Sequence, residues 1–108
     1  MSVECRWFLL RKKPIENSIF KTYDEQVAMI PQGEENPWAR DVVFATTALH
    51  LTTGEWLFER VYVRCKDVDS SGYRVYVGGF DQGGLCINDF WDDYRGGDIG
   101  VCSVRYPK

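Results

Sequence analysis

The chain has 108 residues, of which 44% are hydrophobic and 27% are charged. This balance excludes an intrinsically disordered chain, and the length corresponds to about one domain. We therefore expect one domain spanning residues 1–108. No apolar run approaches the roughly 18 residues that a membrane span needs, so we predict no membrane contact.

The formal net charge is −3, but the charges are unevenly distributed. Residues 1–21 carry a net charge of +3, and residues 81–98 carry five aspartates against Arg95. A mildly acidic protein gains no general attraction to phosphates, which argues against nonspecific binding of nucleic acid. Short charged blocks are also common on ordinary solvated surfaces.

Four cysteines are spread along the chain without a C-x-x-C pair, and His50 is the only histidine. Zinc ligands usually come as close pairs, so we expect no metal ion. The paired glycines do not match a phosphate-binding loop, and we expect no cofactor. The first residues lack the basic and apolar segments of a signal peptide, which predicts a cytoplasmic protein with reduced thiols.

The N-terminal part is predicted to form one strand and one helix. Residues 3–10 alternate imperfectly between apolar and polar side chains, as a strand with one buried face does. Residues 17–30 are predicted to form the helix, with Asn17 or Ser18 as its N-cap. Residues 31–41 contain two prolines and are predicted to be a loop. The apolar positions at helical spacing are Phe20, Tyr23, Val27 and Ile30.

From Val42 onward the pattern is typical of strands. Residues 42–51 and 55–65 flank Thr52-Thr53-Gly54, which matches a three-residue hairpin loop with glycine at its left-handed position. A second hairpin is predicted, with its turn at residues 66–72 and its return strand at 73–79. Centring that turn on Asp69 places Tyr62 opposite Tyr76 and Arg64 opposite Arg74.

Residues 80–98 combine glycine pairs, aspartates and aromatic residues, and are predicted to form short pieces with one or two helical turns at 89–94. Residues 99–106 alternate again and are predicted to form a closing strand. The expected fold is therefore α+β: a bent antiparallel sheet of about five strands with one main helix packed on it.

The predicted sheet has an aliphatic face and an aromatic face, and neither carries enough polar side chains to face water. One helix covers only one face. We therefore expect the other to form a homodimer contact or to line a pocket between helix and sheet. The residues assigned to this pocket or dimer face are Phe44, His50, Trp56, Phe58, Arg60, Tyr62, Arg64, Arg74 and Tyr76.

Residues 89–94 place three carboxylates and three aromatic rings side by side. Aromatic anchors beside charges are typical of surfaces that bind proteins. The structural alternative is that the rings plug the sheet while the aspartates cap helical turns. The residues assigned to a protein partner are Asp89, Phe90, Trp91, Asp92, Asp93 and Tyr94.

Other chemistries have weaker support. Carboxylates in this region could serve as an acid–base pair or bind a hard cation, but spacing along a loop does not show a cleft. Residues 67–72 begin like a calcium loop, yet its twelfth position is Gly78, where a glutamate is required. A lone histidine such as His50 is usually structural or simply exposed. Arginines among aromatic residues are also found where single-stranded nucleic acid binds, but this chain carries no motif for it.

The expected function is that of a non-enzymatic binding protein that forms a homodimer and contacts a basic protein partner, with an inhibitor-like or immunity-like role as one form. The alternative is a small-molecule-binding protein or small enzyme with an aromatic-lined pocket. There, Arg60 or His50 would orient a small anionic ligand. A concave site with converging polar groups favours the alternative, whereas a flat aromatic face favours the interaction.

Overall fold

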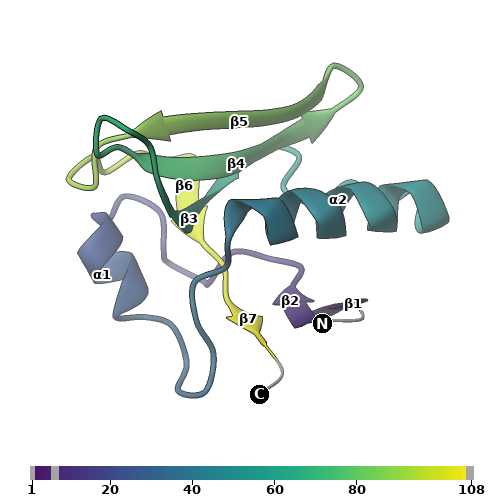
Figure 1. Ribbon diagram of the computed structural model, residues 1–108, viewed down its shortest axis with the longest axis horizontal. Helices are drawn as coiled ribbons and strands as arrows, with labels where there is room; N and C mark the ends of the chain where they lie inside the picture. The colour runs from purple at the N-terminus through teal and green to yellow at the C-terminus, as the bar shows by residue number, and fades with distance from the viewer. Residues whose placement is uncertain (1, 6–7, 107–108) are drawn as a thin grey trace.

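The computed structural model describes residues 2–5 and 8–106, with side chains from Phe8 onward. The predicted single strand 3–10 is wrong, because residues 2–5 and 8–11 form two separate strands that pair antiparallel with each other. Residues 6 and 7 of that prediction lie outside the described residues. Figure 1 shows α2 beneath β4 and β5, with the small sheet of β1, β2 and β7 below it and α1 near the opposite end. The elements in chain order are β1 (Ser2–Cys5), β2 (Phe8–Arg11), α1 (Tyr23–Val27), α2 (Ala39–Thr53), β3 (Tyr62–Val68), β4 (Arg74–Asp81), β5 (Gly84–Phe90), β6 (Ile99–Val101) and β7 (Val104–Arg105).

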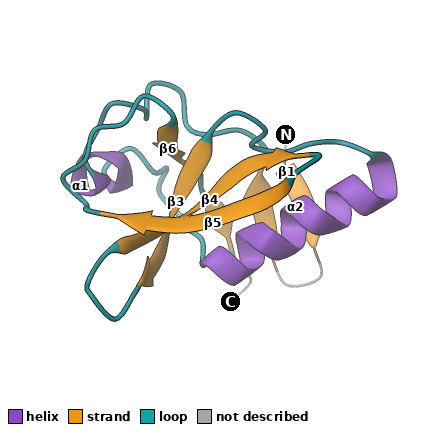
Figure 2. Cartoon of the chain, turned by 90° about the horizontal axis from the view of Figure 1, so that it is seen from above, coloured by secondary structure: helices purple, strands orange, loops and turns teal. Residues whose placement is uncertain are grey.

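The strands form two sheets, of order β1-β2-β7 and β5-β4-β3-β6. Every described strand pair is antiparallel except β3 with β6, which is parallel. Seen from above in Figure 2, α2 lies on the β5 side of the four-stranded sheet and extends toward one end of the molecule. The predicted α+β class, with a mostly antiparallel arrangement and one main helix, is confirmed. The position of that helix is not the predicted one.

The predicted strand 42–51 is wrong, because these residues form most of α2. Val42, Ala45 and Thr46 are buried, and Leu49 packs against the same core, so the buried positions follow helical spacing. Gly54 adopts φ 79° and caps the helix C-terminus, where its N–H donates to the His50 carbonyl at 2.8 Å. A glycine in the left-handed conformation suits a helix end as well as a hairpin loop.

The predicted helix at residues 17–30 is mostly wrong, because only Tyr23–Val27 is helical. Thr22, not Asn17 or Ser18, is the N-cap, and it forms a capping box with Glu25. Asn17 and Phe20 have φ values of 66° and 60°, which place a left-handed backbone where the predicted helix would begin.

The predicted hairpin is confirmed as the pair β3 and β4, but the first strand spans residues 62–68 and not 55–65, and the predicted register is wrong. Tyr62 lies opposite Gly78 and Arg64 opposite Tyr76, because Val68 pairs with Arg74 and the turn is therefore centred on Ser71 and not on Asp69. The register shift between Arg64 and Val68 removes only part of this difference. A Cβ atom on Gly78 would overlap the Val61 carbonyl oxygen and lie 2.7 Å from the Tyr62 Cα, so this close approach requires glycine.

The C-terminal third also differs from the prediction. Residues 84–90 form β5, antiparallel to β4, and so take up part of the predicted helical turns. The closing strand is split into β6, which joins β3, and β7, which joins β2. These two short strands tie the two sheets together.

The core lies between α2, the four-stranded sheet and the small sheet, and it contains Phe8, Leu10, Val42, Ala45, Leu57, Phe58, Val63, Cys65, Val77, Cys102 and Val104. Because side chains alternate along a strand, Val63 and Cys65 face this core while Arg64 faces the other side. On that side lie α1 and the loop after β5, which Arg64 contacts. From the sequence, one face of the sheet is expected to lack a helix. In the structure, the second helix, α1, covers part of that face. Neither described helix is long and apolar enough to cross a membrane.

Candidate protein-binding surface

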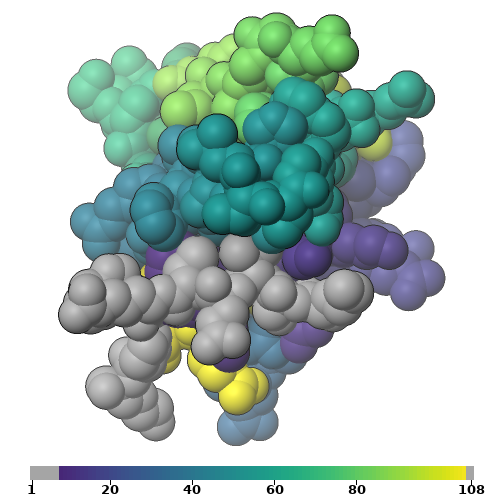
Figure 3. All heavy atoms as spheres, turned by 90° about the vertical axis from the view of Figure 1, so that its right-hand side faces the viewer, coloured from purple at the N-terminus to yellow at the C-terminus, as the bar shows by residue number. Residues whose placement is uncertain are grey.

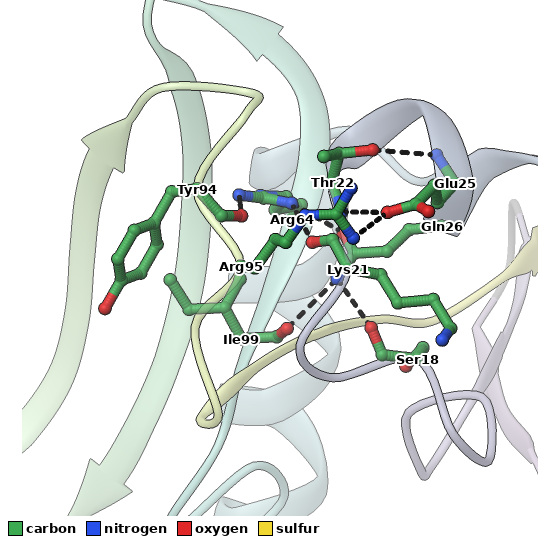
Figure 4. A network of polar contacts seen from close by, with 9 residues as sticks. All are labelled: Ser18, Lys21, Thr22, Glu25, Gln26, Arg64, Tyr94, Arg95 and Ile99. Carbon is green, nitrogen blue, oxygen red and sulfur yellow. Dashed lines mark hydrogen bonds and ion pairs between the residues drawn. The ribbon is translucent and has the colours of Figure 1, made fainter.

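Arg64 on β3 is only 1% exposed, although it carries a positive charge. Its Nη2 donates to the main-chain oxygens of Trp91 at 3.2 Å and Tyr94 at 2.6 Å. Its Nη1 donates to the main-chain oxygen of Lys21 at 3.1 Å and to Gln26 Oε1 at 3.0 Å. Figure 4 shows this side chain between α1 and the segment that follows β5.

These four acceptors keep a buried guanidinium hydrogen-bonded without a direct carboxylate partner. Burial lowers the pKa of Arg64, but a guanidinium remains charged in proteins. Gln26 on α1 is also fully buried, and its Nε2 donates to the main-chain oxygens of Ser18 at 2.8 Å and Ile99 at 3.0 Å. Arg64 and Gln26 therefore fix the backbone after β5 to α1 and to the sheet.

Four aromatic rings gather at this fixed backbone and remain accessible: Trp91 and Tyr94 belong to it, and Phe90 at the end of β5 and Tyr73 before β4 lie beside them. Ring centroids are 5.2 Å apart for Phe90 and Trp91, 4.6 Å for Phe90 and Tyr94, and 6.1 Å for Tyr73 and Trp91. Trp91 is 57% exposed, and the other three rings are between 36% and 43% exposed. Phe90 and Trp91 are therefore not buried against the sheet, which was the structural alternative.

Carboxylates surround these rings. Arg74 donates to both oxygens of Asp92 at 3.1 Å, and its guanidinium lies 3.9 Å from the centre of the Tyr23 ring. A proton shared between the carboxyl groups of Asp69 and Asp89 raises the pKa of Asp89 and lowers that of Asp69. We call the rings Tyr73, Phe90, Trp91 and Tyr94, with the carboxylates Asp69, Asp89, Asp92 and Asp93, the acidic–aromatic surface.

All six residues assigned to a protein partner thus lie in one region, joined by Tyr73 and Asp69, which the sequence prediction missed. Tyr73 precedes β4, and the neighbouring Arg74 pairs with Phe90 of β5. Tyr73 could have been found by predicting a strand at residues 84–90. An antiparallel hairpin of that strand with residues 73–79 brings Tyr73 to the end of β5.

The residues assigned to a pocket or dimer face do not form one face, since Phe44 belongs to a helix. Phe44 is exposed on α2, whereas Phe58 is 4% exposed and belongs to the core. Tyr62 and Tyr76 form a ring pair on the sheet, with centroids 5.1 Å apart. Arg64 and Arg74 instead support the acidic–aromatic surface from beneath.

His50 and Trp56 form a separate cluster. Their ring centroids are 3.8 Å apart, and Phe80 lies 4.8 Å from Trp56. His50 Nδ1 is buried without a hydrogen-bond partner among the described residues. Arg60 is exposed and lines a different hollow, with Tyr62, Asp81 and Asp98.

A groove of about 670 Å³ lies beside Trp56, between residues 11–16 and 55–61. Trp56, Leu57 and Phe58 line it, and Phe58 has a φ of 55° there. Lys12 and Glu55 form a 3.1 Å ion pair among its lining residues. Tyr62 and Tyr76, which the sequence prediction placed in the pocket, are not among the groove's lining residues.

Within residues 8–106, no three histidine, cysteine, aspartate or glutamate side chains are arranged to hold a metal ion. Comparisons of the chain with protein-family models, curated proteins and solved structures gave no significant match.

Proposed function

We propose that this protein is a non-enzymatic binding protein whose acidic–aromatic surface contacts a basic protein partner. The observation that supports this most strongly is the combination of exposed rings with a backbone held by a buried arginine. Aromatic side chains that stay exposed in a fixed geometry bind with little loss of conformational freedom.

Charge selects the kind of partner. Arg74 neutralises Asp92, but Asp69, Asp89 and Asp93 have no basic side chain within ion-pair distance among the described residues. A lysine- or arginine-rich surface would find complementary charge around the apolar rings, which raises association rates and favours the correct partner. An inhibitor of a basic enzyme is one form of such a protein.

A selection of random displayed peptides tests this proposal, because it presumes no partner. The wild-type chain is the bait, and the Trp91→Ser chain is used for counter-selection. Phe44→Ser is the matched control, because Phe44 is 56% exposed but lies on α2. We expect the enriched peptides to combine lysine or arginine with apolar residues.

The dissociation constant of an enriched peptide is expected to rise about 30-fold or more with Trp91→Ser, and to be unchanged with Phe44→Ser. Added salt is expected to weaken binding. Peptides without basic residues, or equal binding to wild type and Trp91→Ser, would contradict the proposal.

The groove supports a second candidate function, the binding of a small anionic ligand with an aromatic group. It offers the Trp56 ring for stacking and Lys13 as a cation beside the Lys12–Glu55 pair. A thermal-shift screen of aromatic carboxylic acids tests it, because a bound ligand stabilises the folded chain. A shift that disappears with Trp56→Ala supports this function, and the absence of any shift argues against it.

We also propose that the protein functions in the cytoplasm. Cys65 and Cys102 are buried and Cys86 is exposed, and all three are free thiols. Free thiols persist in a reducing compartment, and burial raises the pKa of Cys102 to about 12, which keeps that thiol unreactive.

A further inference from the structure

The two edges of the four-stranded sheet are treated differently by the rest of the chain. At the β6 edge, the Ile15 N–H donates to the Val101 carbonyl at 2.7 Å, and the Val101 N–H donates to Ser18 Oγ at 3.1 Å. At the β5 edge, no segment of the described chain pairs with the outer side of the strand. Figures 1 and 3 show β5 at the top of the molecule with nothing over it.

Strand β5 carries few of the features that usually protect an exposed edge, and its one charged residue is Asp89 near its end. Its seven residues, Gly84–Phe90, include no proline and no lysine. Ile87, at the centre of the strand, is 58% exposed. An open edge with a central aliphatic side chain is a template for pairing with another strand.

We propose that β5 pairs antiparallel with β5 of a second copy of this chain, about a two-fold axis at Ile87. All seven residues are paired in this register. Ile87 meets its own counterpart, Leu85 meets Asp89, Cys86 meets Asn88 and Gly84 meets Phe90. The two four-stranded sheets then form one continuous sheet of eight strands.

The direction of the backbone groups supports this register. The Asp89 N–H donates to the side-chain oxygen of its own neighbour Asn88 at 2.9 Å, as an outward-facing group at an open edge does. Backbone groups alternate in direction along a strand, so those of Leu85 and Ile87 face outward as well. Pairing about Ile87 brings these outward groups opposite one another.

The chemistry of the strand favours a second copy as its occupant. Asp89 is the only charged residue of β5, and the proposed register sets it opposite Leu85, so like charges do not face each other. Gly84 lies opposite Phe90 and has no side chain to cover that ring. The paired strands would include Asp89 and Phe90 of each acidic–aromatic surface, and the other residues of that surface would lie outside the paired strands, one set at each end. The proposal does not depend on what those surfaces bind.

Sedimentation equilibrium tests the interface. We expect the wild-type chain to be a dimer at micromolar concentration and Ile87→Lys to be a monomer with an unchanged circular dichroism spectrum. Val68→Lys is the matched control, because Val68 is 49% exposed but lies on β3, and this variant should remain dimeric. A monomeric wild type, or an Ile87→Lys chain as dimeric as the wild type, would overturn the proposal.

Disulfide cross-linking tests the register. In the proposed pairing Cys86 faces Asn88, in a non-hydrogen-bonded pair with Cα atoms about 4.5 Å apart, which is within the range that disulfides span. With oxidised glutathione as the oxidant, Asn88→Cys is expected to give a covalent dimer, whereas the wild type, with Cys86 opposite Asn88, is not. Cross-linking of the wild type through Cys86 would overturn this register, because it requires an axis at Cys86.

Discussion

Arg64 donates a 2.6 Å hydrogen bond to the main-chain oxygen of Tyr94, a residue 30 positions further along the chain. The arginine is buried, whereas the Tyr94 ring is 43% exposed. The same guanidinium also bonds the Trp91 carbonyl. A charged group inside the protein therefore fixes the backbone whose side chains form the proposed binding surface.

Replacing Arg64 with methionine removes the donors but keeps a long side chain. The acceptors at Lys21, Gln26, Trp91 and Tyr94 then lose this partner, and we expect the free energy of unfolding to fall by about 3 kcal/mol or more. Urea denaturation measures the change. Arg95→Met is the control, because the Arg95–Glu25 ion pair is exposed on both sides and its loss should cost less than about 1 kcal/mol. Equal effects of the two changes would contradict the role given to Arg64.

Gly78 is predicted to be intolerant of any side chain. The added Cβ in Gly78→Ala meets backbone atoms of Val61 and Tyr62, which cannot move without disturbing the β3–β4 pairing. We expect a loss of about 3 kcal/mol or more, as overpacking against a fixed backbone causes. In the control Gly83→Ala, the nearest atom is the end of the Asp81 side chain, which can rotate away. Denaturation midpoints compare the two, and a near-neutral Gly78→Ala would contradict the close approach.

The sequence predicted the fold class and the β3–β4 hairpin, because β-branched residues alternate there between two turn signals. It failed at α2, where six of fifteen residues are valine or threonine and therefore favour strand geometry locally. Packing of Val42, Ala45 and Leu49 on the core overrides that preference. The helical spacing of these positions and the glycine after Thr53 were the signals for the correct assignment.

The acidic–aromatic segment was found from the sequence because its chemistry is concentrated in six consecutive residues. The buried Arg64 that holds this segment in place was not found from the sequence. Arg64 is assigned from the sequence, with Tyr62, to a pocket or dimer face, because an arginine on a strand next to apolar residues gives no sign of its hydrogen-bond acceptors. Those acceptors are main-chain oxygens from distant segments, and only the three-dimensional arrangement shows them.

Acid is predicted to destabilise the protein in part through Glu34. Arg11 donates to both of its carboxylate oxygens at 2.7 Å, and Ser103 donates to one of them, also at 2.7 Å. These contacts lower the pKa of Glu34 from 4.5 to about 2. The stabilisation is therefore complete above pH 4.5 and lost as the pH falls towards 2.

Glu34→Gln is expected to lower the free energy of unfolding by about 1–2 kcal/mol at neutral pH, since solvent screens the half-exposed Arg11. The difference from the wild type should shrink as the pH approaches 2. Urea denaturation across this range provides the measurement. A difference that is independent of pH would show that the Arg11–Glu34 contact does not carry the effect.

The Asp69–Asp89 pair is predicted to have the opposite pH dependence: it should destabilise the protein as the pH rises. The pKa of Asp89 is raised by its hydrogen bond to Asp69, so its protonated form is favoured in the folded chain, and this stabilisation is lost as the pH rises through that pKa. Asp89→Asn, which mimics the protonated form, should raise the urea midpoint at neutral pH and not at acid pH. Asp93→Asn is the exposed control. A lower midpoint for Asp89→Asn at neutral pH would contradict this assignment.

A nuclear magnetic resonance titration of the isotope-labelled chain with a basic peptide from the selection locates the binding surface directly. If the acidic–aromatic surface binds the peptide, the amide signals that shift belong to Tyr73, to residues 89–94 and to neighbouring Asp69. The indole signal of Trp91 then shifts while that of Trp56 does not. Shifts centred on Trp56 and residues 11–16 would instead place binding in the groove and rule out the acidic–aromatic surface.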